Sequence, residues 1–171
     1  MLPQLRRILI LLFLISCIQN SLAVEPQTQQ EFRSGEELLA NEKFAEAVLV
    51  FEVRLKEFEL QKNSKAVADT LYHLGICYNS LAQYRKALDA LTRAERIHFE
   101  LGNKEAAARD LTERANSELL LANADQSISL SESALRVHRE MGNRKGEADT
   151  LRYIGLAYVN KGNFQKAMEY A

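Results

Sequence analysis

The sequence predicts an all-α protein, a right-handed solenoid of antiparallel helix hairpins with about four repeats, the last of them truncated. The main observation is a repeated motif: ELGNKEAAARDL at residues 100–111 returns as EMGNRKGEADTL at residues 140–151, forty positions later. Self-similarity at a fixed interval of this size is typical of repeat architectures, in which neighbouring units share one core. The composition agrees, because two Pro and seven Gly with 47% apolar residues favour long helices over disorder.

The first 23 residues are predicted to be an export signal. Two arginines precede an apolar run at residues 8–18, which is too short to span a bilayer comfortably as a helix. The small residues of SLA at 21–23 suit cleavage after Ala23. Two alternatives stay open: residues 14–17 resemble a bacterial lipobox, which would make Cys17 a lipidation site, and the segment can also remain as an uncleaved anchor. All three outcomes export the remaining chain to the periplasm or cell exterior. Lipidation of Cys17 or an uncleaved anchor would also attach it to a membrane.

The forty-residue step divides the rest of the chain into four units. They are residues 24–63, 64–103, 104–143 and 144–171, with the first and third degenerate and the fourth incomplete. In the second unit, apolar and small residues recur at spacings of three and four, which predicts two helices separated by a break near residues 82–83. The first stripe is Ala68, Leu71, Leu74, Gly75 and Tyr78, and the second is Tyr84, Ala87, Leu88, Leu91, Ala94 and Ile97.

Small and aromatic residues are expected to set the spacing of the helices. Gly102 suits a left-handed cap at the end of a hairpin. Gly75 and Gly155 are expected to let the first helix of their units approach the second closely, and Tyr78 and Tyr158 to fill the space between hairpins. Neither stripe can be buried within one hairpin, so neighbouring hairpins must stack.

The pattern Leu71-x-x-Leu74-Gly75-x-x-Tyr78, followed by Ala87, Leu91 and Ala94, resembles the tetratricopeptide repeat. The period is longer than the usual ~34 residues and is similar to a forty-residue variety of bacterial signalling and scaffold proteins. The resemblance covers nearly all of residues 24–171. The third unit departs from it most, and we expect it to fold more loosely, with its polar residues needing partners or water. The substitutions there are Arg114, Ala115, Glu118, Ser127 and Ser131.

The resemblance implies a binding surface. In tetratricopeptide proteins the first helices of successive units line a concave groove that holds a peptide or a helix of another protein. Carried over position by position, the candidate groove residues are Phe32, Glu36 and Leu39 in unit one, Asp69, Tyr72, Ile76 and Asn79 in unit two, Arg109, Thr112, Asn116 and Leu119 in unit three, and Asp149, Arg152, Leu156 and Val159 in unit four.

The sequence contains no motif for catalysis or for a cofactor, so we expect no enzyme activity and no bound cofactor or metal. His98 and His138 occupy the same repeat position, but equivalent positions of stacked helices lie about 10 Å apart. Two histidines that share one zinc ion would each need a nitrogen about 2.1 Å from it. Cys77 is interpreted as a packed thiol, with His73 one turn away as a half-exposed helix residue. Basic and acidic residues are interleaved at a net charge of −1, which argues against a nucleic-acid partner.

The predicted function is a non-catalytic protein–protein interaction scaffold of the cell envelope or exterior. A second hypothesis is that the sequence is the N-terminal recognition arm of a larger signalling protein or CHAT-type peptidase. The intact mass of the protein from its native cell separates the two hypotheses.

Overall fold

The computed structural model describes residues 34–170, and every regular element within them is a helix. Residues 34–40 are helical, and α2 to α7 are each 17 residues long and separated by three residues, so a helix begins every 20 positions. The predicted all-α solenoid of helix hairpins is confirmed. The helices are α2 (Phe44–Leu60), α3 (Ser64–Ser80), α4 (Tyr84–Glu100), α5 (Lys104–Leu120), α6 (Ala124–Glu140), α7 (Arg144–Asn160) and α8 (Phe164–Glu169).

Each turn between these helices contains one residue in the left-handed conformation. Gly102, Gly142 and Gly162 take φ values of 72°, 67° and 71°. Glycine adopts this conformation without the steric cost that a Cβ brings, so the predicted cap at Gly102 is confirmed. The remaining turns build the same geometry with residues that carry side chains, namely Glu42, Lys62, Ala82 and Ala122.

At four turns, the asparagine that follows the left-handed residue caps the next helix. The Asn103 side chain accepts a hydrogen bond from the backbone N–H of Ala106 at 3.2 Å, and Asn63, Asn143 and Asn163 accept the equivalent bond. An N-terminal cap of this kind satisfies an N–H group that the helix start leaves open and contributes about 1 kcal/mol. The Gly-Asn pair of the repeated motif therefore ends one helix and begins the next.

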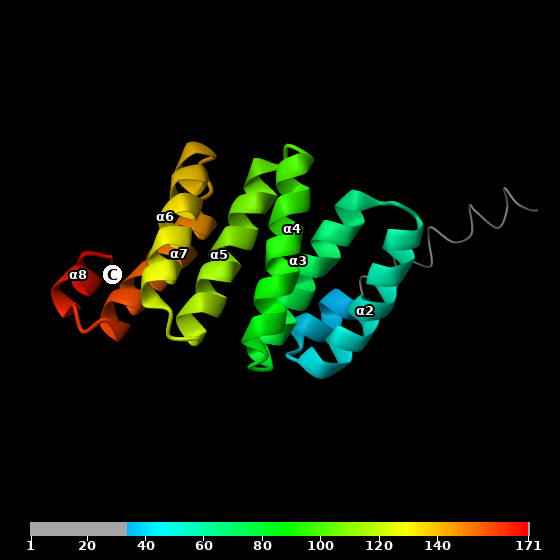
Figure 1. The fold of residues 1–171 in the computed structure, drawn as a ribbon, viewed down its shortest axis with the longest axis horizontal. Coiled ribbons are helices and arrows are strands. Elements are labelled where there is room, and N and C mark those ends of the chain that lie inside the picture. Colours follow the sequence, from blue (N-terminus) through cyan, green and yellow to red (C-terminus); the bar gives the residue numbers. More distant parts are fainter. Residues whose placement is uncertain (1–33, 171) are drawn as a thin grey trace, which may run out of the picture.

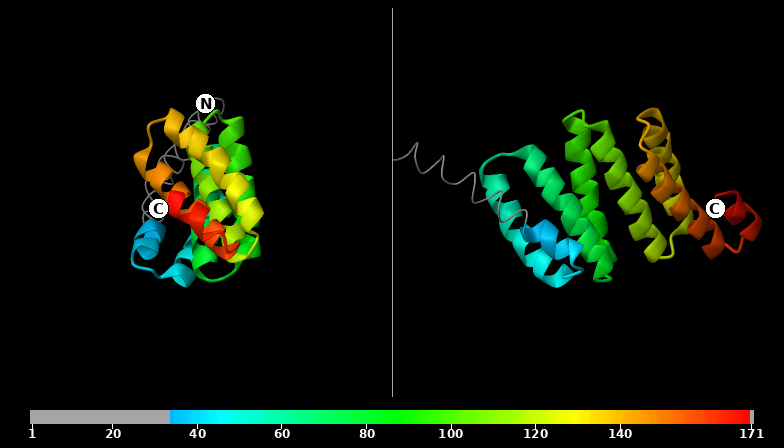
Figure 2. Two further views of the ribbon diagram at one scale, coloured as in Figure 1. Left: turned by 90° about the vertical axis from the view of Figure 1, so that its left-hand side faces the viewer. Right: turned by 180° about the vertical axis from the view of Figure 1, so that it is seen from behind.

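The helices form two layers. α3 packs on α5, and α5 packs on α7, whereas the described helices α2, α4 and α6 make no comparable contact with one another. The first helices are therefore the inner, concave layer and the second helices the outer one. Figure 1 shows the hairpins stacked in chain order, and Figure 2 (left) shows α6 and α7 on opposite sides of the stack.

The core has two apolar parts. The larger cluster joins α2, α3 and α4 and includes Phe51, Leu71 and Leu91. The smaller cluster joins α5, α6 and α7 around Leu119 and Tyr153. The third unit also buries polar side chains, which are Asp110, Thr112, Ser117, Ser127, Ser131 and His138.

Several polar residues of the third unit have partners, as expected. The Ser127 hydroxyl donates to the Ala115 carbonyl at 2.8 Å, and Arg114 pairs with Glu95 of α4. The Ser131 hydroxyl, in contrast, is buried with no hydrogen-bond partner. The looser packing of this unit stays a prediction.

The two glycines expected to allow close helix contact behave differently. A Cβ on Gly75 would lie 2.4 Å from Cγ of Leu91, so only glycine fits and the prediction is confirmed. A Cβ on Gly155 would meet its nearest neighbour, the Ala167 carbonyl oxygen, at 3.6 Å, which is ordinary contact. The repeat equivalent of Leu91 in this unit is residue 171, which lies outside the described residues, so the close approach expected at Gly155 stays a prediction.

The predicted export signal, including Cys17, lies outside the described residues. Within residues 34–170, no helix combines the length and the apolar character that crossing a bilayer requires.

Candidate peptide-binding groove

The predicted groove residues occupy the inner layer but differ in exposure. Phe32 lies outside the described residues. Glu36, Arg109, Arg152, Leu156 and Val159 are exposed on the helices of this layer. The half-buried ones are Leu39, Asp69, Tyr72, Ile76, Asn116 and Asp149.

Three predicted groove residues are buried, which corrects the sequence-based assignment. Asn79, Thr112 and Leu119 are each less than a tenth exposed. Asn79 accepts a hydrogen bond from the Ser117 hydroxyl, Leu119 belongs to the smaller apolar cluster, and Thr112 lies 3.1 Å from Nε2 of His138. The resemblance to the tetratricopeptide repeat placed these residues on the inner face, but each first helix packs against the next one and covers that flank.

A pocket of about 260 Å³ opens in the inner layer, where α3 and α5 meet the start of α7. Its size suits one or two side chains of a bound segment. It combines groove residues predicted from the sequence with others that sequence reasoning missed. The predicted ones are Tyr72, Arg109, Thr112 and Asp149, and the missed ones are Glu113, His138, Asn143, Lys145 and Gly146.

Two arginine–tyrosine contacts shape the inner layer. The Arg109 guanidinium lies 5.1 Å from the ring centre of Tyr72, and that of Arg152 lies 4.2 Å from the ring centre of Tyr153. A guanidinium over an aromatic face is attracted by the ring quadrupole. Burial raises the pKa of Tyr153 to about 12 and also raises the pKa of Tyr72, so both rings carry neutral hydroxyls. The pairs hold two cationic donors in fixed positions along the groove.

Glu113 lines the pocket of about 260 Å³ together with a second acid, Asp149. Burial raises the pKa of the Glu113 carboxyl, against the lowering effect of a hydrogen bond from Asn116. Its charge acts on the hydroxyls of both Tyr72 and Tyr153. The signal that could have found Glu113 is its spacing, because it lies four residues after Arg109 and on the same helix face.

A second pocket of about 540 Å³ runs along α7 and α8 and is mostly apolar. It contains three residues of the predicted groove and five others. The predicted ones are Arg152, Leu156 and Val159, and the others are Ala148, Leu151, Gly155, Ala167 and Tyr170.

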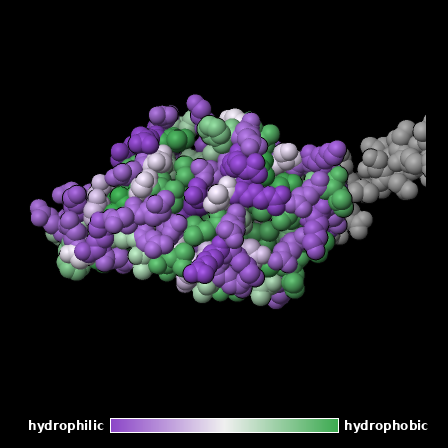
Figure 3. Space-filling view, viewed as in Figure 1, coloured by the Kyte–Doolittle hydropathy of each residue, from purple (hydrophilic) through white to green (hydrophobic). Residues whose placement is uncertain are grey.

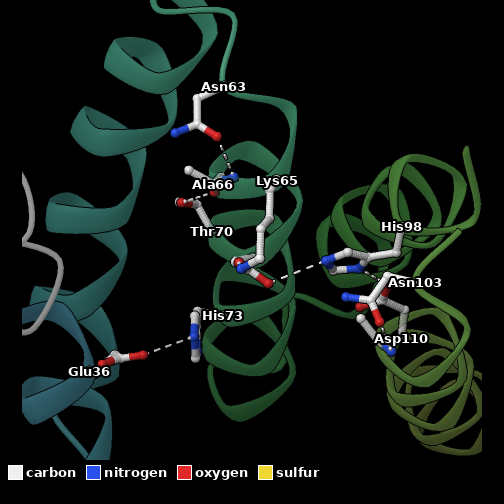
Figure 4. Close-up of polar contacts among 11 residues, drawn as sticks. Glu36, Asn63, Lys65, Ala66, Thr70, His73, His98, Asn103 and Asp110 are labelled. Carbon is white, nitrogen blue, oxygen red and sulfur yellow. Dashed lines mark hydrogen bonds and ion pairs between the residues drawn. The ribbon is translucent and has the colours of Figure 1, made fainter. Parts of the chain in front are cut away.

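A buried ion pair fixes the second hairpin to the third. Nδ1 of His98 lies 2.6 Å from Oδ2 of Asp110, and both side chains are fully buried. Nε2 of His98 lies 3.3 Å from Oδ1 of Asp69, so the imidazole bridges carboxylates of α5 and α3 (Figure 4). Burial alone would lower the pKa of His98, but the hydrogen bonds to Asp110 and Asp69 raise it to about 9.

The pKa values of the two acids in this cluster are shifted in opposite directions. Burial raises the pKa of Asp110 to about 6, although His98 pulls it down. Burial would also raise the pKa of Asp69, but hydrogen bonds from His98 and Lys65 lower it to about 2. At neutral pH the cluster is therefore an imidazolium between two carboxylates.

His138 occupies the same repeat position without an acidic partner. Its Nε2 lies 3.1 Å from the Thr112 hydroxyl, which lies 3.1 Å from the Thr150 hydroxyl. Burial lowers the pKa of His138, so this imidazole is neutral. A Cβ on Gly146 would lie 2.4 Å from Nδ1 of His138, so glycine is required beside the ring.

The other residues with reactive side chains are packed. Cys77 is buried as predicted, and burial raises its pKa to about 11, which keeps it a thiol. His73 is half-buried and stacks on Phe51, with Nε2 3.4 Å from Glu36, and burial lowers its pKa to about 4. Within residues 34–170, no three His, Cys, Asp or Glu residues are placed to hold a metal ion.

The comparison with solved structures identifies the fold. The Rap conjugation gene regulator of plasmid pLS20, solved in complex with the Phr* peptide, superposes with a TM-score of 0.74 at 17% identity over 82% of this chain. BtubC (BKLC) from P. vanneervenii gives a TM-score of 0.75 at 16% identity over 84% of this chain. A Podosopora anserina protein described as a kinesin light chain with TPR-like repeats gives 0.71 at 15% identity over 84%. The chain therefore has the tetratricopeptide-like helical solenoid fold.

The chain is shorter than these proteins and spans 39% of the Rap regulator, 60% of BtubC and 71% of the Podosopora protein. No protein-family model matches the sequence, and no curated protein matches it. The likeness is therefore one of fold.

Proposed function

We propose that the chain is a non-catalytic interaction scaffold that binds a peptide or a helix of a partner protein in its concave groove. The observation that carries this is the 260 Å³ pocket in the layer of first helices, where Tyr72, Arg109 and Glu113 converge. Aromatic and arginine side chains are the types that contribute most to protein interfaces. The Rap regulator, of similar fold, was solved in complex with a peptide, which supports the same use of this fold.

The groove offers a mixed set of contacts. Donors come from Arg109 and Lys145, acceptors from Glu113 and Asp149, and an apolar continuation from the pocket beside Leu156. A segment with one or two polar anchor residues followed by apolar residues matches this order.

A peptide-display selection against the immobilised full chain tests the proposal. A selected peptide should bind the Arg109→Ala variant roughly 30-fold more weakly, or about 2 kcal/mol, as is usual for a central arginine. The matched control is Arg136→Ala, because Arg136 is an exposed arginine of the outer layer on α6. Equal affinity of both variants, or failure to select any peptide, overturns the groove as the binding site.

We further propose export to the cell envelope or exterior, supported by the positive, apolar and small-residue pattern of residues 1–23. Fractionation of the native cell with an antibody to the chain, together with mass spectrometry of the mature N-terminus, tests this. A cytoplasmic chain that still begins at Met1 would contradict export, and lipid on Cys17 would show the lipoprotein form.

A further inference from the structure

The turns that join one hairpin to the next lie along a single edge of the solenoid, which is the upper edge in Figure 1. We call this the joint edge and define it as residues 59–67, 99–107 and 139–147. It consists of the ends of α2, α4 and α6, the three turns that follow, and the first turns of α3, α5 and α7. The opposite edge carries the turns within hairpins.

The joint edge exposes large apolar side chains at all three turns. Leu60 is 85% exposed, Phe99 is 75% exposed, and Leu101 and Met141 are each about half exposed. Figure 3 shows apolar side chains emerging between hydrophilic ones along this edge. On the described part of the opposite edge, the large apolar side chains of Leu120, Val159 and Phe164 are 45%, 43% and 64% exposed.

The repeat register indicates that this exposure is not a general property of the hairpin ends. The position of Leu60 carries Glu100 and Glu140 in the next units, and the position of Phe99 carries Glu59 and Arg139. Polar residues therefore satisfy the fold at both positions, and Leu60 and Phe99 are not required for packing.

The acidic side chains of the joint edge are largely held by neighbours. Glu59 pairs with Arg93 at 2.5 Å, and Glu100 pairs with Arg96 at 3.2 Å. Glu147 similarly pairs with Arg139, and Glu105 accepts a hydrogen bond from Asn143.

The basic side chains of the same edge are available. Within the described chain, Lys62, Lys104, Arg144 and Lys145 form no ion pair, whereas two acids of these turns keep an uncompensated charge: Glu140 has no partner and Glu105 has only the neutral Asn143 amide. The charge that ion pairs leave unbalanced on this edge is therefore positive, four basic groups against two acids, and it lies beside the exposed apolar side chains.

We propose that the joint edge is a contact surface for a lipid bilayer with anionic headgroups. Protruding apolar tips in a row suit a flat surface, since a partner helix needs a groove in which to lie. Leucine, phenylalanine and methionine side chains partition into the headgroup region, while neighbouring lysines and arginines attract anionic lipids. The edge meets the pocket of the inner layer at Asn143, Lys145 and Gly146, which belong to both surfaces, whereas Leu60, Phe99 and Lys104 lie outside that pocket.

The experiment uses the absence of tryptophan from the chain. Phe99→Trp in the full chain places one fluorescent reporter on the joint edge. Leu49→Trp places a matched reporter on the outer flank of α2, where Leu49 is 66% exposed. Because each reporter senses only its own surroundings, attachment through the apolar segment at residues 8–18 does not produce the signal.

On adding vesicles of phosphatidylglycerol and phosphatidylcholine, we expect the emission of Phe99→Trp to move to shorter wavelength and that of Leu49→Trp to stay unchanged. Pure phosphatidylcholine vesicles, high salt, or the added changes Lys104→Glu and Arg144→Glu should each reduce the shift. No shift at Phe99→Trp, or equal shifts of both reporters, overturns the proposal. A shift that appears only with a protein partner also overturns it and makes the edge a protein interface.

Discussion

His98 and His138 stand at the same position of successive repeats, and both are buried in the last turn of an outer helix. His98 lies between the carboxylates of Asp110 and Asp69, and its pKa is raised to about 9. His138 contacts the Thr112 hydroxyl, and burial lowers its pKa. One repeat position thus holds a charged imidazole at one contact between successive hairpins and a neutral imidazole at the next. We call each such contact between hairpins a joint.

The two histidines differ in charge because the first helices that pack against them carry different residues at two repeat positions. Forty residues after Asp110 stands Thr150, and forty residues after Asp69 stands Arg109. The Thr150 hydroxyl bonds to the Gly146 carbonyl and Thr112. Within the described residues, Nδ1 of His138 therefore has no partner where Nδ1 of His98 has a carboxylate, and Arg109 lowers the pKa of His138 further. The preceding joint is different again, because the equivalent of His98 there is Phe58. The solenoid keeps its geometry while the chemistry of each joint changes from apolar to ionic to neutral polar.

The largest expected effect is the loss of the buried carboxylate. Asp110→Ala leaves a buried imidazole with only the partly exposed Asp69, and we expect a loss of about 3 kcal/mol in the free energy of unfolding at pH 7. Thr150→Ala, at the same repeat position, removes a neutral hydrogen bond and should cost roughly 1 kcal/mol. Urea denaturation of both variants is the measurement. Equal losses would mean that the two joints do not differ energetically.

The sequence predicted the helices and their turns because these depend on local spacing and on the Gly-Asn pairs. It did not predict the pair of His98 and Asp110, because they come from different helices and meet only when hairpins stack. The sequence did contain a signal for this pair. At one buried repeat position, Thr70 and Thr150 are neutral in their units, whereas Asp110 is an acid in the unit between them. The same stacking buried Asn79 and Leu119, which the resemblance to the tetratricopeptide repeat had placed on the open groove.

The next effect is a loss of stability at alkaline pH that His98 causes and His138 does not. The folded pKa of His98, about 9, is above the unfolded value of 6.5, so its stabilising contribution is complete below pH 6.5 and is lost as the pH rises through 9. Between pH 7 and pH 9 we expect a loss of about 2 kcal/mol in the free energy of unfolding. Asp110 and Asp69 titrate below this window, and Cys77 titrates above it.

A pair of matched variants shows which histidine causes the fall in stability between pH 7 and pH 9. Urea denaturation at several pH values should show that His98→Gln removes the fall between pH 7 and pH 9, whereas His138→Gln leaves it in place. The pKa of His138 is lowered, so its contribution has the opposite sign and declines as the pH falls through its folded value. If His98→Gln kept the slope, another group would be responsible.

The smallest effect is expected when the ionic joint is rebuilt as the apolar one. The double variant His98→Phe with Asp110→Thr copies Phe58 and Thr70 of the preceding joint, where both residues are buried. Replacing a buried ion pair with packed residues of similar volume is often neutral or stabilising, whereas removing one partner leaves an uncompensated charge. We expect each single change to cost about 2 kcal/mol or more and the double variant to lie within about 1 kcal/mol of the parent. Double-mutant analysis of urea denaturation at pH 7 tests the idea, and purely additive losses would mean that the pair does not act as a unit. Recovery in the double variant would show instead that the geometry of the repeat accepts either chemistry at its joints.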